Sequence, residues 1–137
     1  MALIRDLLTN YIQGAKILGK SDKIARVQET LDKLFPYQVG SKGQLLEWYK
    51  EFEEQDPQHR HISHLLGLFP GKQILPRRDK VLTDAVRQSM AIRGDGGTGW
   101  SMAWKINMWD RLEDGNHAYT MLRKALNYVN VTDVVMK

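Results

Sequence analysis

Hydrophobic residues recur every three or four positions in the first part of the chain, which is the spacing of an amphipathic helix. In residues 2–18 these positions are Leu3, Ile4, Leu7, Leu8, Tyr11, Ile12, Ala15 and Leu18. Gly19 is a typical helix end. A second helix is predicted over residues 22–35 and ends before Pro36, because a residue that precedes proline disfavours helical backbone angles. Since only a short turn joins the two helices, we expect them to pair as a hairpin.

The same spacing returns in the second half of the chain. It predicts a helix over residues 79–92 that ends at Gly94, a helix over residues 100–112, and a last helix after Asp114. The 100–112 helix carries apolar residues around most of its circumference, so we expect it to be buried on several sides. Strand patterns are too sparse for a parallel sheet. The pattern therefore predicts an all-α fold of helical hairpins, as in one part of a toroid of such hairpins.

Between these helical regions, residues 36–78 form a long connection in which Gly and Pro interrupt the helical spacing. Its most unusual part is the stretch 58–71, where polar residues stand next to an apolar run closed by Pro70-Gly71. This stretch holds Arg60 and three of the four histidines of the chain, at His59, His61 and His64. Polar groups concentrated on a long connection between helices are functional more often than structural.

Three interpretations of this stretch stay open from the residues alone. A zinc-type site is conceivable because His59 and His61 share a face of an extended segment, but the spacing matches no standard zinc motif and Arg60 would place a fixed cation beside the metal. Recognition of a neutral polyhydroxylated ligand is favoured by the donor fork of Arg60 and the donor and acceptor of His61. The third interpretation is that these side chains only tie down the loop by bonding backbone carbonyls, and His64 is the member best explained as structural.

Residues 44–52 place a carboxylate and an aromatic ring side by side, at Glu47 and Trp48, in a short segment of undetermined type. Trp48 fits a platform on which a sugar ring stacks, and it fits a core anchor equally well. The acidic residues that follow are expected to form a solvated edge, at Glu51, Glu53, Glu54 and Asp56.

A second stretch of interest, residues 93–101, carries glycines in a GxGxxG pattern at Gly94, Gly96 and Gly99. A dinucleotide-binding phosphate cradle requires a strand before the glycines, whereas a predicted helix precedes them here, which excludes that interpretation. A tight turn between two helices explains the glycines better. In such a turn Asp95 is expected to bond nearby backbone N–H groups, and Thr98 or Ser101 to cap the next helix.

Composition narrows the classes of function. The chain of 137 residues, with 42% apolar residues and four Trp, is long enough for one domain with a core. The net charge of +4 arises from scattered Lys and Arg without a dense basic block, so no nucleic-acid partner is indicated. No apolar run has the length of a membrane span, and Met1 is followed by a charged segment without the features of a signal peptide. The absence of Cys excludes disulfides but assigns no compartment.

The chain also carries three sequence blocks in a fixed order. These are Gly43-Gln-Leu-Leu-Glu-Trp48, then His59-Arg-His-Ile-Ser-His-Leu65 with Phe69-Pro-Gly71, then Arg93-Gly-Asp-Gly-Gly-Thr-Gly-Trp-Ser101 followed by Ala103-Trp-Lys-Ile106. Together they resemble glycoside hydrolase family 95, the inverting α-L-fucosidases, and the similarity runs from the first helix to about residue 128. The resemblance implies an (α/α)6 barrel whose loops line a sugar pocket, in which Arg60 and His61 contact the fucose. Other family members act on α-L-galactosides, so the resemblance implies the class more firmly than the sugar.

The resemblance further implies that the catalytic set lies outside this chain. In the family, the general acid is a Glu upstream of the first helix here, Asn residues further upstream activate the water, and a supporting Asp lies in a block that would follow Lys137. Glu47 and Asp95 match family blocks, but we interpret them as pocket-wall and turn residues rather than as the carboxylate pair of glycoside hydrolysis.

The sequence therefore predicts that residues 1–137 are a segment of a single (α/α)6 catalytic domain that hydrolyses terminal α-L-fucosides with inversion. The expected ligand is a fucosylated oligosaccharide or another small glycan, contacted by Arg60, His61 and Trp48, without a metal or a cofactor. The alternative is a non-catalytic all-α carbohydrate-binding or interaction module. The segment alone is expected to be inactive and to self-associate, because five helices cannot cover all of their apolar surface.

Overall fold

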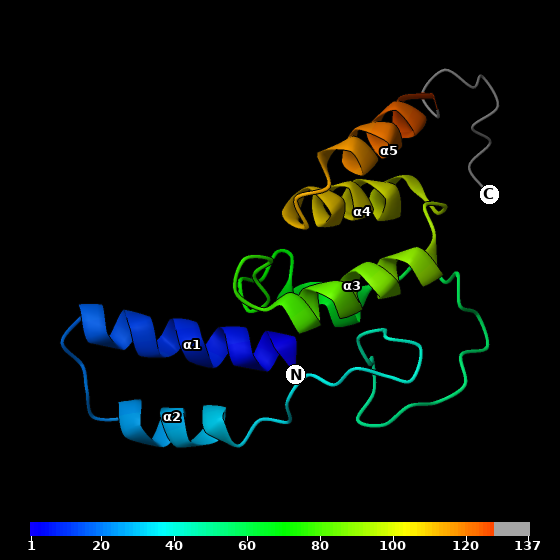
Figure 1. The fold of residues 1–137 in the computed structure, drawn as a ribbon. Coiled ribbons are helices and arrows are strands. Elements are labelled where there is room, and N and C mark those ends of the chain that lie inside the picture. Colours follow the sequence, from blue (N-terminus) through cyan, green and yellow to red (C-terminus); the bar gives the residue numbers. More distant parts are fainter. Residues whose placement is uncertain (128–137) are drawn as a thin grey trace.

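The computed structural model describes residues 1–127, and this part of the chain is all-helical (Figure 1). Its elements are α1 (Ala2–Ile17), α2 (Ile24–Asp32), the short 3-10 helix η1 (Ser63–Gly67), α3 (Lys80–Arg93), α4 (Gly99–Arg111) and α5 (Gly115–Asn127). Residues 1–127 contain no strand, and one isolated bridge pairs Val39 with Leu45. The five predicted helices and the all-α class are confirmed.

Helices α1 and α2 pack against each other as an antiparallel hairpin, which confirms their predicted pairing (Figure 1). Arg5 on α1 binds the segment that follows α2, since its Nη2 donates to the carbonyl oxygens of Leu34 and Phe35 at 3.4 and 3.5 Å. Gly19, with a φ of 64°, supplies the left-handed residue beyond α1. Helix α2 has no buried residue, so this hairpin lies at the edge of the described part of the molecule.

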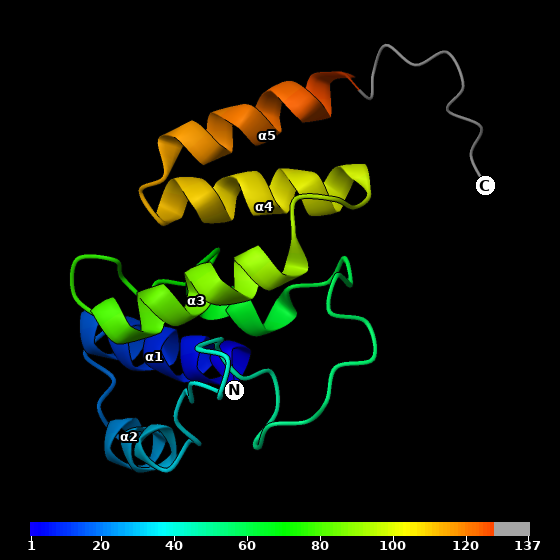
Figure 2. The same cartoon turned by 45° about the vertical axis from the view of Figure 1, so that its right-hand side comes forward.

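Helices α3, α4 and α5 lie in successive layers, with α4 between the other two (Figures 1 and 2). The core lies among these helices and residues 62–74 of the long connection. Its buried side chains include Ile62, Leu65, Leu68 and Ile74 from the connection and Val86, Met90, Met108, Leu112 and Met121 from the helices. Burying an aliphatic side chain of this size contributes about 1.5–3 kcal/mol relative to leaving it exposed. The second half of the connection is therefore part of the core rather than a surface loop.

Polar contacts tie the first half of the connection to this core. The backbone N–H of Leu45 donates to Oγ of Ser89 on α3 at 2.9 Å. The phenol of Tyr37 donates to Oε1 of Gln73 at 2.6 Å, and burial raises the pKa of Tyr37, so the phenol keeps its proton. Gly67 allows this arrangement because a Cβ at that position would collide with the Tyr37 hydroxyl.

Helix α4 is buried less completely than its apolar pattern predicts. Its buried apolar residues are Met102, Met108 and Trp109. Trp100 remains 47% exposed, whereas Lys105 on the same helix is fully buried. Exposed apolar surface is more extensive on α1, where Leu3 and Leu7 are 67% and 68% exposed.

Candidate functional site

Arg60 and His61 lie where the long connection passes the start of α4, and both residues are exposed. The His61 ring stacks on the ring of His59 with centroids 4.8 Å apart, and it lies 5.1 Å from the ring of Trp100. Trp104, one turn later on α4, continues this row 6.4 Å from Trp100. The rings of Trp100 and Trp104 form what we call the aromatic row. The predicted sugar-contact pair, Arg60 and His61, lies beside this row through the ring of His61.

The backbone of residues 60–62 is held in place by its neighbours, whereas the side chain of Arg60 forms no hydrogen bond within residues 1–127. Ile62 is fully buried in the core, and the hydroxyl of Ser101 donates to the carbonyl oxygen of Arg60 at 2.7 Å. The Arg60 guanidinium is exposed and makes no hydrogen bond to another group of residues 1–127. For Arg60, the interpretation that its side chain ties down the loop is therefore wrong within the described part. An unengaged guanidinium beside an imidazole offers several donors and an acceptor, as recognition of hydroxyl groups requires.

Trp48 is 64% exposed, so its interpretation as a core anchor is wrong within the described residues. Its ring borders two hollows in the surface, of about 490 and 440 Å³. The second hollow is also lined by Phe52 and His59. Because His59 stacks on His61, this hollow adjoins the arginine–histidine pair. Trp48 is available for stacking, and its contact with a sugar stays a prediction.

Arg93, at the C-terminal end of α3, opens the block 93–101, but the sequence pattern assigned it no role of its own. It is 5% exposed and makes three contacts beneath the loop. Its Nη2 donates to Glu47 at 3.2 Å, and its Nη1 donates to Glu54 at 3.1 Å and to the carbonyl oxygen of Pro57 at 3.0 Å. One planar fork therefore clamps both ends of the segment 47–57. The burial of Arg93 could have been inferred from its spacing, since it lies on the buried face of α3 three residues after Met90.

Two of the acidic residues that were expected to form a solvated edge accept hydrogen bonds within the described part of the chain. Glu54 accepts the hydrogen bond from Arg93. Glu51 accepts from the backbone N–H and the hydroxyl of Ser41, both at 2.9 Å, and from the amide of Gln44 at 2.9 Å. These hydrogen bonds, led by the backbone N–H of Ser41, lower the pKa of Glu51. Glu51 stays exposed, as the prediction expects, whereas Glu54 is partly buried against Arg93, so the solvated-edge prediction is wrong for Glu54.

His64 is buried beneath the loop, next to Arg93. Its Nδ1 has no hydrogen-bond partner in the described part and lies 3.8 Å from the carboxylate of Glu47. Burial, followed by the charge of Arg93, lowers the pKa of His64 to about 4, so the ring is neutral near pH 7. Its burial agrees with the structural role predicted for it. Nδ1 of His64 makes none of the predicted bonds to backbone carbonyls of residues 1–127.

The glycine-rich stretch is a turn between α3 and α4, as predicted. Positive φ angles occur at Gly94, with 64°, and at Gly97, with 140°. Helix α3 precedes the glycines, which confirms that they do not follow a strand. Thr98 stands at the N-cap position of α4 but makes no side-chain cap hydrogen bond, and the Ser101 hydroxyl is taken by Arg60. The predicted capping role is therefore wrong for both residues.

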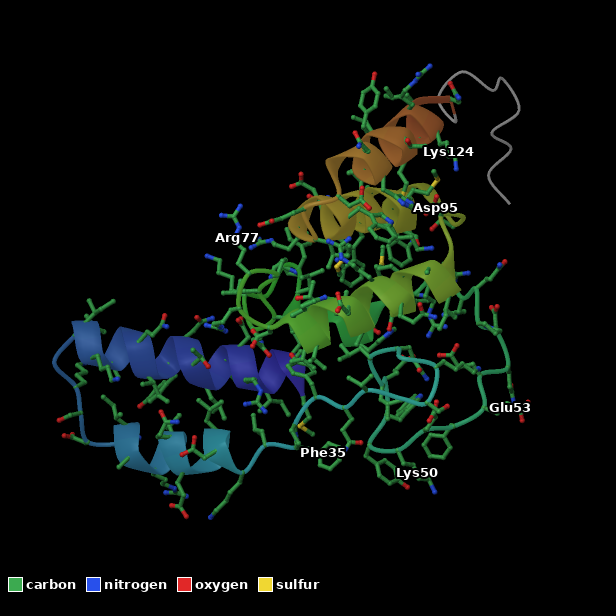
Figure 3. The ribbon with its side chains drawn as sticks, viewed as in Figure 1. Phe35, Lys50, Glu53, Arg77, Asp95 and Lys124 are labelled. Carbon is green, nitrogen blue, oxygen red and sulfur yellow. The ribbon has the colours of Figure 1, made fainter. Side chains whose placement is uncertain are left out.

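Asp95 in this turn pairs with α5 rather than with nearby backbone N–H groups, which corrects the prediction for it. Its Oδ1 lies 2.8 Å from Nε2 of His117, and its Oδ2 lies 3.6 Å from Nζ of Lys124. Figure 3 shows Asp95 and Lys124 on the same side of α4 and α5. The His117 ring also stacks on Trp109 with centroids 4.1 Å apart. This contact between distant parts of the chain decides the partner of Asp95.

Two further features of residues 1–127 bear on the class of site. No three His, Asp or Glu side chains of this part are gathered closely enough to hold a metal ion. Each of its helices is too short or too polar to cross a lipid bilayer.

An exposed arginine–histidine pair beside aromatic rings is suited to binding a ligand that carries hydroxyl groups. The chain belongs to glycosyl hydrolase family 95, because the model of the family's catalytic domain matches residues 1–137.

Similar proteins carry fucosidase names. Alpha-L-fucosidase 2 of Arabidopsis thaliana is 36% identical over 132 residues, which cover 95% of this chain and 16% of that protein. Probable alpha-fucosidase A of Aspergillus oryzae is 30% identical, with 91% of this chain and 19% of that protein covered. Its namesake from Aspergillus niger is 32% identical, with 90% and 17% covered. The chain therefore spans less than a fifth of the length of these relatives.

Proposed function

We propose that the full-length protein is a glycoside hydrolase that removes terminal α-L-fucose from oligosaccharides with inversion. In this proposal, residues 1–137 are one segment of a single (α/α)6 catalytic domain and supply part of its sugar pocket. The observation that carries the proposal is the exposed Arg60–His61 pair beside the aromatic row, in a chain that belongs to family 95. The names of the relatives support fucose as the sugar.

Arg60 and His61 have separate roles in this proposal. The fork of Arg60 donates hydrogen bonds to neighbouring sugar hydroxyls, and His61 adds a donor or an acceptor. The ring of His61 lies between His59 and Trp100, which restricts its orientation before the sugar binds. Trp48 presents an exposed aromatic face against which the apolar side of a sugar ring packs.

The acid and the base belong to other parts of the catalytic domain in this proposal. Inverting hydrolysis needs one carboxylic acid to protonate the leaving group and one base to activate water. Glu47 is engaged with Arg93 at 3.2 Å, and Asp95 is engaged with His117 at 2.8 Å. Both carboxylates thus hold contacts within the fold, Glu47 between the long connection and α3, and Asp95 between the glycine-rich turn and α5. This supports their interpretation as wall and turn residues.

The test is an assay of the full-length protein on an aryl α-L-fucoside and on a fucosylated oligosaccharide, with the matching α-L-galactoside for comparison. Release of the β-anomer of fucose, followed by NMR, is expected for inversion. Trp48→Ala is expected to raise KM, with Tyr49→Ala as the control because Tyr49 is a similarly exposed neighbour at 65%. If L-fucose binds but no fucoside is hydrolysed, the non-catalytic carbohydrate-binding module is the better description. Absence of both binding and hydrolysis contradicts the proposal.

A further inference from the structure

Helix α4 buries two polar residues, Ser101 and Lys105, and both are 0% exposed. Their spacing of four residues places them on the same face of the helix. Burying an ammonium group is unfavourable unless hydrogen bonds replace the water that it loses. The partners of Lys105 therefore indicate what this burial stabilises.

Lys105 reaches back over the glycine turn that precedes its own helix. Its Nζ donates to the carbonyl oxygen of Gly94 at 2.8 Å and to that of Gly96 at 2.7 Å. Burial lowers the pKa of Lys105, and the nearby carboxylate of Asp95 acts in the opposite direction. A turn rich in glycine has little conformational preference of its own. Lys105 therefore fixes the shape of the turn.

Ser101 connects the same face of α4 to the loop that carries the arginine–histidine pair. Its hydroxyl donates to the carbonyl oxygen of Arg60 at 2.7 Å. Gly97 of the glycine turn packs against Ser101 and Arg60. A Cβ added at Gly97 would lie 3.0 Å from Oγ of Ser101 and 3.8 Å from Cβ of Arg60. The turn held by Lys105 and the loop held by Ser101 are thus packed against each other.

We infer that Ser101 and Lys105 are positioning residues for sugar binding, which hold the Arg60 backbone and the glycine turn in one fixed arrangement at the start of α4. This inference rests on the proposed function, since it concerns the arginine that binds the sugar. The guanidinium of Arg60 is unengaged within residues 1–127, so within this part of the chain only the backbone position from which it extends is fixed. Ser101 sets that backbone directly, and Lys105 sets the turn against which it packs.

The experiment measures the Kd of the full-length protein for L-fucose by titration calorimetry, together with its Tm. Ser101→Ala removes one hydroxyl with little change in volume, and loss of one such hydrogen bond is expected to raise Kd about three- to ten-fold. Lys105→Met keeps the length of the side chain and removes its donors, and it is expected to raise Kd at least as much. Thr98→Ala is the matched control, because this hydroxyl lies in the same turn without a cap hydrogen bond, and its Kd is expected to stay unchanged.

A double-mutant cycle separates positioning from general stability. If Ser101 acts through Arg60, adding Ser101→Ala to Arg60→Ala raises Kd by less than about two-fold. The inference is overturned, with the proposed function intact, if Arg60→Ala weakens binding but Ser101→Ala lowers Tm alone. Full additivity with Arg60→Ala overturns it as well. If Arg60→Ala itself leaves Kd unchanged, the sugar-binding role of Arg60 fails together with the inference. Should Lys105→Met not fold, Ser101→Ala decides the question by itself.

Discussion

The Nδ1 atom of His64 lies 3.8 Å from Oε2 of Glu47, too far for a hydrogen bond, whereas the guanidinium of Arg93 reaches the same oxygen at 3.2 Å. Arg93 therefore forms the hydrogen bond to Glu47 that His64 would otherwise form. His64 is left buried, with its Nδ1 unpaired in the described part and its pKa lowered to about 4. Protonation of His64 consequently opposes folding.

The first prediction concerns pH. Between the ordinary pKa of about 6.5 and the folded value of about 4, the unfolded chain binds a proton at His64 and the folded chain does not. Stability therefore falls as pH drops through this window, by about 3 kcal/mol from this residue. Urea unfolding of the wild type and of His64→Gln, from pH 7.5 to pH 4, measures the effect.

His64→Gln is expected to show the shallower pH dependence, since glutamine does not titrate. His59→Gln, which changes an exposed histidine of the same stretch, is the control and is expected to keep the wild-type slope. Equal slopes for the wild type and His64→Gln would contradict the prediction.

The second prediction concerns the clamp made by Arg93. Arg93→Met removes the guanidinium and leaves Glu47, Glu54 and the Pro57 carbonyl without their donor. Loss of a buried ionic partner is expensive, but the two carboxylates remain 34% and 33% exposed, so we expect a loss of about 2–4 kcal/mol in the free energy of unfolding. Arg93→Lys is expected to recover only part of it, because an ammonium lacks the planar fork.

Chemical denaturation checks this prediction, with Arg77→Met as the control. Arg77 pairs with Glu113 at 2.8 Å at a highly exposed site, and loss of such a pair changes stability by less than about 1 kcal/mol. An equal effect of Arg93→Met and Arg77→Met would show that the clamp contributes nothing beyond a surface ion pair.

The third prediction concerns the sugar-contact pair. Arg60→Ala and His61→Ala in the full-length protein are each expected to lower kcat/KM for an α-L-fucoside by about ten-fold or more, because a sugar hydroxyl then loses its partner. The Tm is expected to stay within a few degrees, since both residues are exposed. Treatment with a chelator is expected to change neither quantity. Loss of activity on chelation would favour the metal interpretation of the histidines.

The fourth prediction concerns the chain of 137 residues by itself. It is expected to hydrolyse no aryl α-L-fucoside, since the acid and the base are proposed to lie elsewhere. It is also expected to bind a hydrophobic dye and to self-associate, because α1 exposes Leu3 and Leu7. Leu3→Gln with Leu7→Gln should reduce both effects, and Asn10→Gln is the control on the same helix. A monodisperse monomer without dye binding in light scattering would contradict this.

The positions of the helices were predictable because their signals are local. Spacing of apolar residues, Gly94 as a stop and Pro36 as a breaker act within a few residues of the chain, and each corresponds to a helix boundary within a few positions. A functional role for the stretch 58–71 could also be predicted, because its composition is unusual for a connection between helices. Arg60 and His61, the pair singled out in this stretch, are both exposed.

The partners of the polar residues were not predictable, because they come from distant parts of the chain. Asp95 meets His117, Glu54 meets Arg93, and Lys105 turns back to the carbonyls of Gly94 and Gly96. A local pattern shows that a carboxylate or an ammonium is present, but not which donor or acceptor the packing of α3, α4 and α5 brings within hydrogen-bonding distance.

The sequence by itself determined the helices, the all-α class and the resemblance to family 95, since these depend on residue order alone. Only the tertiary structure decided which polar groups are buried. Arg93 and Lys105 carry charges that a helix usually presents to solvent, yet both side chains lie inside. The reason is that burial of a polar group is favourable or unfavourable according to the partners that packing supplies, and those partners are set by the fold.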